Sequence, residues 1–147
     1  FGFETSFWIQ RLLATLFATA SAFLFALYIY LRRIKDERKR IRNFLESYLN
    51  YIIEELDFIP EANKATIKHL NPNIIDEIII SGHVEDVSQL LIRIQSQISL
   101  YQQFREEAIN YLNNPNNTDS LPVKMKINLD NSTKTIKKSV SDCLKEM

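Results

Sequence analysis

The sequence predicts an all-α fold in which an N-terminal transmembrane helix continues into a cytosolic antiparallel helical hairpin or small bundle. A short strand and a further helix are expected at the C-terminus. Three observations support this prediction. Residues 12–31 form an uncharged run of twenty residues. The whole chain of 147 residues holds only two glycines and four prolines. Beyond the run, most apolar residues recur at spacings of three and four, as they do on one face of a helix.

The uncharged run is long enough to cross a bilayer, because twenty residues at about 1.5 Å each cover the roughly 30 Å of the hydrocarbon core. A cleaved signal peptide is the alternative, since residues 18–22 read Ala-Thr-Ala-Ser-Ala and offer small-x-small cleavage patterns. The apolar run continues nine residues past that point and stops at a basic cluster, as a stop-transfer sequence does. We therefore expect a single-pass anchor over residues 12–31.

A basic juxtamembrane segment, residues 32–42, follows the run with seven cations and two anions, whereas residues 1–11 carry one of each. By the positive-inside rule, residues 1–11 lie outside and the rest of the chain lies in the cytoplasm. The cations also suit anionic headgroups, although fixing the orientation is reason enough for them. The expected headgroup contacts are Arg32, Arg33, Lys35, Arg38, Lys39, Arg40 and Arg42.

Small residues recur every four positions within the run. Such a stripe lets two helix backbones approach closely in lipid, so we expect it to contact a second copy or another membrane subunit. The alternative is that alanine is simply common in membrane helices. The run holds no ionisable residue, and nothing in it indicates an ion path. The expected helix contacts in the membrane are Ala14, Ala18, Ala22 and Ala26.

The first helix is expected to continue past the basic segment to about Asp57, because neither glycine nor proline occurs between Gly2 and Pro60. Pro60 then opens a short helix to about Leu70, as prolines do in a first helical turn. A face for burial is predicted by the three-to-four spacing of Ile41, Phe44 or Leu45, Tyr48, Ile52 and Leu56.

Two further helices complete the expected helical domain, residues 43–114. Residues 73–81 follow an Asn-Pro pair and end at Gly82, a left-handed cap. Residues 84–113 carry a heptad seam, with Arg105 discordant, and are expected to pack antiparallel against the first helix. The expected hairpin packing residues are Ile52, Leu56, Val87, Leu91, Ile94, Ile98 and Tyr101. A domain of 72 residues has a core worth about 3–5 kcal/mol, so we expect it to be weakly stable or to self-associate.

Residues 115–147 are expected to form a linker and a tail. Residues 123–130 alternate strictly between apolar and polar side chains, which predicts a half-buried strand. An amphipathic helix follows, and the tail either docks or is partly disordered. The apolar side of that helix is expected to carry Ile136, Val140, Cys143 or Leu144, and Met147.

Charge and motif content exclude several function classes. The chain is neutral overall, but residues 43–119 hold twelve acidic and four basic residues, which disfavours nucleic-acid binding. No phosphate-binding loop, metal-ligand spacing or nucleophile elbow occurs. His69 and His83 lie near helix ends without catalytic neighbours, and the single Cys143 cannot form an intramolecular disulfide. We therefore expect no catalytic residue, no cofactor and no metal, and predict that the chain is not an enzyme.

The order of apolar anchor, basic segment, acidic helix and short helices resembles a diffuse class of small prokaryotic membrane-anchored helical proteins without assigned activity. Residues 71–76 (Asn-Pro-Asn-Ile-Ile-Asp), residues 81–83 (Ser-Gly-His), residues 90–92 (Leu-Leu-Ile) and Tyr101 belong to this resemblance, which covers about residues 12–113. It implies an inner-membrane location and no catalytic residues. The sequence thus favours a membrane-anchored interaction or assembly module, an accessory subunit of a larger membrane complex in contact with lipid and with a membrane partner or a second copy. The alternative is a membrane-tethered sensor or regulator that binds a soluble partner.

Overall fold

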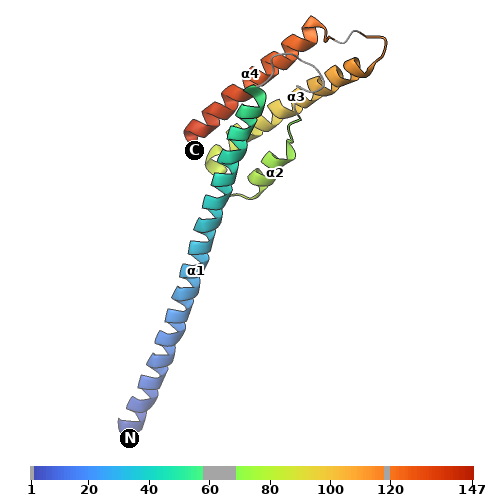
Figure 1. The fold of residues 1–147 in the computed structure, drawn as a ribbon. Coiled ribbons are helices and arrows are strands. Elements are labelled where there is room, and N and C mark those ends of the chain that lie inside the picture. The colour runs from blue at the N-terminus through green and yellow to red at the C-terminus, as the bar shows by residue number, and fades with distance from the viewer. Residues whose placement is uncertain (1, 58–68, 118–119) are drawn as a thin grey trace. The chain divides into compact units, whose positions relative to one another are not determined.

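The described part of the chain is helical. The computed structural model describes residues 2–57, 69–117 and 120–147, and this part holds four α-helices and one short 3-10 helix without a strand. The helices are α1 (Gly2–Asp57), α2 (Asn73–Ile80), η1 (Glu85–Val87), α3 (Ser88–Asn113) and α4 (Val123–Glu146) (Figure 1). The predicted all-α architecture, a long N-terminal helix followed by a small helical bundle, is confirmed. The helix predicted to open at Pro60 lies outside the described residues.

The chain divides into two compact units, Phe1–Arg40 and Ile41–Met147. The first unit is the N-terminal part of α1. The second contains the end of α1 together with α2, η1, α3 and α4. Helix α1 spans Gly2–Asp57, and the residues that directly follow Asp57 lie outside the described part of the chain.

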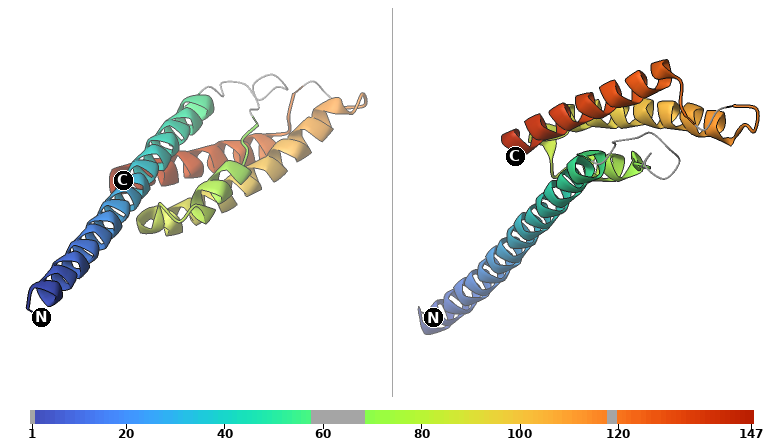
Figure 2. Two further views of the ribbon diagram at one scale, coloured as in Figure 1. Left: turned by 90° about the horizontal axis from the view of Figure 1, so that it is seen from below. Right: turned by 45° about the horizontal axis from the view of Figure 1, so that its top comes forward.

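Within the second unit, α3 and α4 lie side by side and run antiparallel, which the views of Figure 2 show together with Figure 1. Helix α2 runs antiparallel to α3 on another side. The amide of Gln95 bonds to the carboxylate of Asp76, and the amide of Gln102 bonds to the carbonyl of Leu70. As the residue number rises along α3, the number of its partner therefore falls.

The predicted antiparallel pairing of α3 with α1 is wrong. Arg42 of α1 contacts the carboxylate of Asp86, which lies just before α3, so the two helices bring their earlier ends together. An antiparallel pair would place the start of α3 beside the end of α1. The sequence offered α1 as the partner because α4 was not recognised as a full-length helix.

The predicted strand over residues 123–130 is also wrong, because this segment forms the first two turns of α4. Positions four apart share one face of a helix, so Met125 and Leu129 face the core while Val123 and Ile127 are exposed. The alternation over these eight residues is therefore compatible with both the two-residue period of a strand and the 3.6-residue period of a helix. The helical period is favoured because it continues to Ile136, and an isolated strand has no partner in the described chain.

One hydrophobic core is shared by all elements of the second unit. Helix α1 contributes Leu45, Leu49, Ile52 and Leu56, and Phe44, the alternative to Leu45, is 54% exposed. The core extends into α4, so residues 43–114 do not hold all of it. The seven buried residues of α4 are Leu129, Ser132, Thr133, Ile136, Ser139, Val140 and Cys143.

Local signals at the turns act as the sequence predicts. Gly82 adopts φ +70°, the left-handed conformation expected after α2. The side chain of Asn71 accepts a hydrogen bond of 3.0 Å from the backbone N–H of Asn73 at the start of α2. The hydroxyl of Tyr48 donates to the carbonyl of Asn71 at 2.8 Å, which ties the end of α1 to this turn.

Candidate membrane-spanning and packing surfaces

The apolar part of α1 is uncovered. By length and composition this helix could cross a membrane, and none of its apolar stretch is buried. The core helix of a soluble protein can be equally long and apolar, but most of its surface would be buried. A signal sequence near the N-terminus can also have this length and composition. The large exposed apolar side chains of this stretch are Phe7, Trp8, Ile9, Leu12, Leu13, Leu16, Phe17, Phe23, Leu24, Phe25, Leu27, Tyr28, Ile29, Tyr30 and Leu31.

The hydroxyls of two threonines inside this stretch bond within the helix. The hydroxyl of Thr15 donates to the carbonyl of Arg11 at 2.9 Å, and that of Thr19 donates to the carbonyl of Thr15 at 2.7 Å. A hydroxyl without a partner is costly in hydrocarbon, and these bonds to the preceding turn remove that cost. The helix surface is therefore compatible with a bilayer despite its threonines.

The four alanines of the predicted stripe, Ala14, Ala18, Ala22 and Ala26, are all exposed on this surface. No described segment of the chain packs on them. Because positions four apart advance slowly around a helix, the four lie along one side of α1. Alanine offers a shallow surface there, between larger exposed side chains on both sides.

Arg42, the last cation of the basic segment, differs from the other six in its burial and its contacts. Arg32, Arg33, Lys35, Arg38, Lys39 and Arg40 are exposed, as the headgroup prediction requires. Arg42 is partly buried, and its guanidinium binds the carboxylate of Asp86, while its Nε is buried without a hydrogen-bond partner. Sequence reasoning placed Arg42 with the headgroup cations because Asp86 lies 44 residues away, beyond any local pattern.

The seven predicted packing residues, Ile52, Leu56, Val87, Leu91, Ile94, Ile98 and Tyr101, all lie in the buried core of the second unit. Sequence reasoning missed Leu49, which is fully buried one turn after Leu45. The signal was present, since Leu45, Leu49 and Ile52 keep the spacing of four and three.

Burial governs the titration of two core groups. Burial, with a smaller contribution from the carboxylate of Asp86, raises the pKa of the Cys143 thiol to about 11. Burial raises the pKa of the Tyr101 phenol to about 12, against a smaller opposing effect of Arg105. A reactive cysteine needs a lowered pKa and access to solvent. Cys143 therefore remains a protonated packing residue at neutral pH.

A shallow pocket of about 240 Å³ lies on the α3–α4 pair. Its lining has no titratable group, so it offers no acid or base for chemistry. Among the described residues, no group of three or more His, Cys, Asp or Glu side chains gathers as a metal site would require. The pocket is lined by Gln97, Leu100, Phe104, Asn128, Asn131, Ser132 and Thr135.

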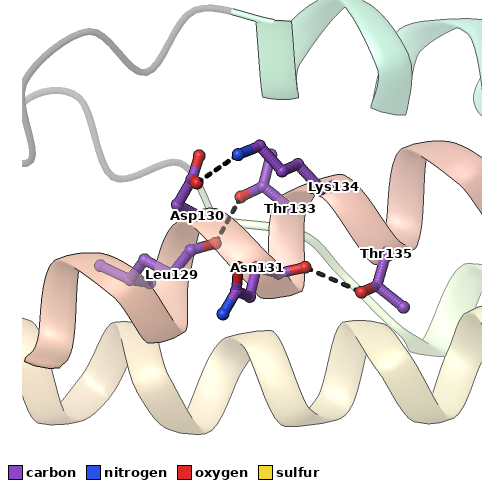
Figure 3. A network of polar contacts seen from close by, with 6 residues as sticks. All are labelled: Leu129, Asp130, Asn131, Thr133, Lys134 and Thr135. Carbon is purple, nitrogen blue, oxygen red and sulfur yellow. Dashed lines mark hydrogen bonds and ion pairs between the residues drawn. The ribbon is translucent and has the colours of Figure 1, made fainter.

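Polar contacts on α4 beside this pocket are local to the helix (Figure 3). The hydroxyl of Thr133 donates to the carbonyl of Leu129 at 2.8 Å, which satisfies a buried hydroxyl. The ammonium of Lys134 binds the carboxylate of Asp130 at 2.7 Å on the exposed side. Such bonds one turn apart stabilise the helix itself and do not assemble a site.

Comparison of the chain with protein-family models, with curated proteins and with solved structures finds no match.

Proposed function

We propose that this chain is a membrane-anchored, non-enzymatic interaction or assembly module, an accessory subunit of a larger membrane protein complex. The observation that carries the proposal is the apolar stretch of α1, which no described segment covers. Burying apolar surface is worth about 25 cal/mol per Å², and soluble monomers rarely expose contiguous apolar patches above a few hundred Å². A bilayer supplies the missing cover along the whole stretch.

The charge distribution supports an orientation for this anchor. Six exposed cations follow the apolar stretch directly, whereas Arg11 is the one cation before it. Such an excess is retained on the cytoplasmic side of membranes. We therefore propose an N-terminus outside and the unit Ile41–Met147 in the cytoplasm, in a prokaryotic inner membrane.

The uncovered alanine stripe supports a role in assembly. Within lipid, the hydrophobic effect gives helices no reason to associate, so close packing across small residues becomes the main attraction. Ala18 and Ala22 lie at the centre of the stripe and permit such an approach. The compact bundle of the second unit then provides a folded surface next to the membrane for a partner subunit.

The anchor is tested on the full chain expressed in bacteria, by washing membranes with alkaline carbonate and measuring the intact mass of the retained protein. The proposal predicts that the uncleaved chain stays in the membrane. Release of the chain by carbonate, or a mass showing cleavage near residues 18–22, would contradict the anchor.

Assembly is tested by purifying the full chain from mild detergent at low and high salt. A stoichiometric membrane partner, or a second copy, retained at high salt supports the accessory subunit. A soluble partner lost at high salt favours the alternative of a membrane-tethered regulator. A monodisperse monomer at both salt concentrations, together with an unchanged profile for Ala22→Leu, would contradict an assembly role.

A further inference from the structure

One side of α1 carries charges of both signs just beyond the apolar stretch. The two anions of the basic segment, Asp36 and Glu37, each lie three or four positions from Arg33 and from Arg40. Arg32 belongs to the same group, because Asp36 follows it by four positions. Side chains at these spacings are neighbours on a helix, so guanidiniums and carboxylates alternate along this side.

The structure gathers these five charged side chains around one open hollow on the surface of α1. Phe25, Tyr28 and Ile29 line the hollow on the side of the apolar stretch, so its whole lining comes from α1. All of its lining residues are exposed. Within the described part of the chain, the structure shows no ion pair for the five charged side chains. Their charges are therefore free to meet those of a partner.

The hollow lies on a heptad seam that begins inside the apolar stretch. Alternating spacings of four and three connect Ala22, Ala26, Ile29, Arg33, Asp36 and Arg40. Two helices pack along such a spacing in a coiled coil, with these residues at the a and d positions. The two alanines allow the helices to approach closely within the membrane. The seam therefore combines small side chains in the apolar stretch with alternating charges beyond it.

The charges of this seam are complementary to those of a second, parallel copy. Two copies with the same excess of cations insert in the same orientation, so their helices run parallel. Each a or d side chain of a coiled coil inserts among four residues of the facing helix, which places Asp36 of one copy between Arg33 and Arg40 of the other. At the flanking g and e positions, Arg32 of one copy faces Glu37 of the other. Because the pair is symmetric, each of these contacts forms twice.

The a-position arginines also face their own counterparts, and the aspartates in the neighbouring layer offset that repulsion. Polar residues at a positions cost stability but specify the register and the number of helices. Asp36 and Glu37 also count against anionic lipid on this side, because carboxylates repel phosphate groups. The other cations, such as Lys35 and Arg38 at the outer c and f positions, lie away from the seam.

We propose that a second copy of this chain packs against this side of α1 and forms a parallel dimer along the seam from Ala22 to Arg40. This inference rests on the proposed membrane-anchored assembly module and names its partner. The alternating charges beyond the apolar stretch fix the register of the two helices, and the alanines bring them together within the membrane.

The test uses the full chain in phosphatidylcholine vesicles, with a donor or an acceptor fluorophore attached after Met147. Energy transfer at a series of protein-to-lipid ratios gives the dissociation constant of the dimer. Arg33→Glu/Arg40→Glu makes the charged part of the seam wholly acidic, and Asp36→Lys makes it wholly basic. Lys35→Glu/Arg38→Glu is the matched control, because it changes the net charge as the acidic-seam variant does, at the outer positions of the same helix.

We expect the unchanged chain to dimerise. Each seam variant alone brings like charges together in every charged layer, so its dissociation constant should rise at least about tenfold. An equal mixture of the acidic-seam and basic-seam variants should associate to within about threefold of the unchanged chain, because their seams are then opposite in charge. The control should change by less than about twofold, because its positions lie outside the seam.

Equal losses in the control and the acidic-seam variant would overturn the inference, because net charge alone would then set the association. A mixture as weak as its two components would also overturn it, because the seam charges would then not meet across the dimer. A monomeric unchanged chain would exclude a second copy. If that monomer resists carbonate extraction and retains a different membrane subunit, the assembly module stands and only the named partner is wrong. A chain released by carbonate overturns both.

Discussion

Replacing Ile136 by alanine tests whether α4 belongs to the core. Ile136 is 0% exposed and lies at the middle of the buried side of α4. The change removes three carbons, worth about 0.8 kcal/mol each when buried, and leaves a cavity that adds to the loss. The gain in helix propensity returns about 0.4 kcal/mol. The expected loss in the free energy of unfolding is therefore about 3 kcal/mol.

Ile127→Ala is the matched control, because Ile127 lies on the same helix and loses the same atoms but is 52% exposed. No cavity forms there, and the propensity gain offsets much of the lost burial. We expect a loss below about 1 kcal/mol.

The assay is pulse proteolysis of the full chain in detergent over a series of urea concentrations. With a urea dependence of about 1–3 kcal/mol per M, Ile136→Ala should lower the unfolding midpoint by about 1–3 M, and Ile127→Ala by much less. Equal midpoints for the two variants would refute the docking of α4 and restore the interpretation of residues 115–147 as a tail.

Three further predictions concern the membrane helix, the seam of α3 and the buried titratable groups. Ala18→Leu/Ala22→Leu should weaken helix association in detergent by about 1–2 kcal/mol, measured by energy transfer between labelled copies or with the partner. Ala20→Leu, on the opposite side of α1, should leave association unchanged, and equal effects would assign the stripe to lipid. Ile98→Asn should cost at least about 2 kcal/mol in urea unfolding, because Ile98 is fully buried and the change replaces an apolar side chain by an amide in a largely apolar core cluster. An unchanged midpoint would contradict the assigned core face. Because the folded chain raises the pKa of Cys143 from 9.0 to about 11 and that of Tyr101 from 10.0 to about 12, the unfolded chain loses these protons first. The free energy of unfolding should therefore fall between pH 9 and 12, and Cys143→Val should remove the part lost between pH 9 and 11; a flat profile would contradict the burial of both groups.

The sequence was sufficient to predict helices and their buried sides where apolar residues keep a helical spacing over many residues. The seam from Val87 to Tyr101 repeats for several turns, and its members are buried in the structure. The left-handed conformation of Gly82 was predictable because glycine tolerates a positive φ without strain.

The sequence was insufficient where a short pattern fits two structures or where partners are distant. The alternation over residues 123–130 fits a strand, and only the core contacts of Leu129 and Ile136 decide for a helix. Whether Phe44 or Leu45 is the buried residue depends on which side of α1 faces the core, because neighbouring positions on a helix are rotated by about 100° about its axis. The contact of Arg42 with Asp86 depends on the tertiary fold.

The membrane anchor and its orientation are tested together by the topology of the full chain in a bacterial inner membrane. Reporters that are active on one side only are fused before Phe1 or after Met147, and protease is added to intact and to opened cells. We expect the C-terminal reporter to be cytoplasmic and protected in intact cells, and the N-terminal reporter to be outside and digested. A C-terminal reporter that is digested in intact cells, or one recovered in the soluble fraction, would contradict a membrane-anchored cytoplasmic module.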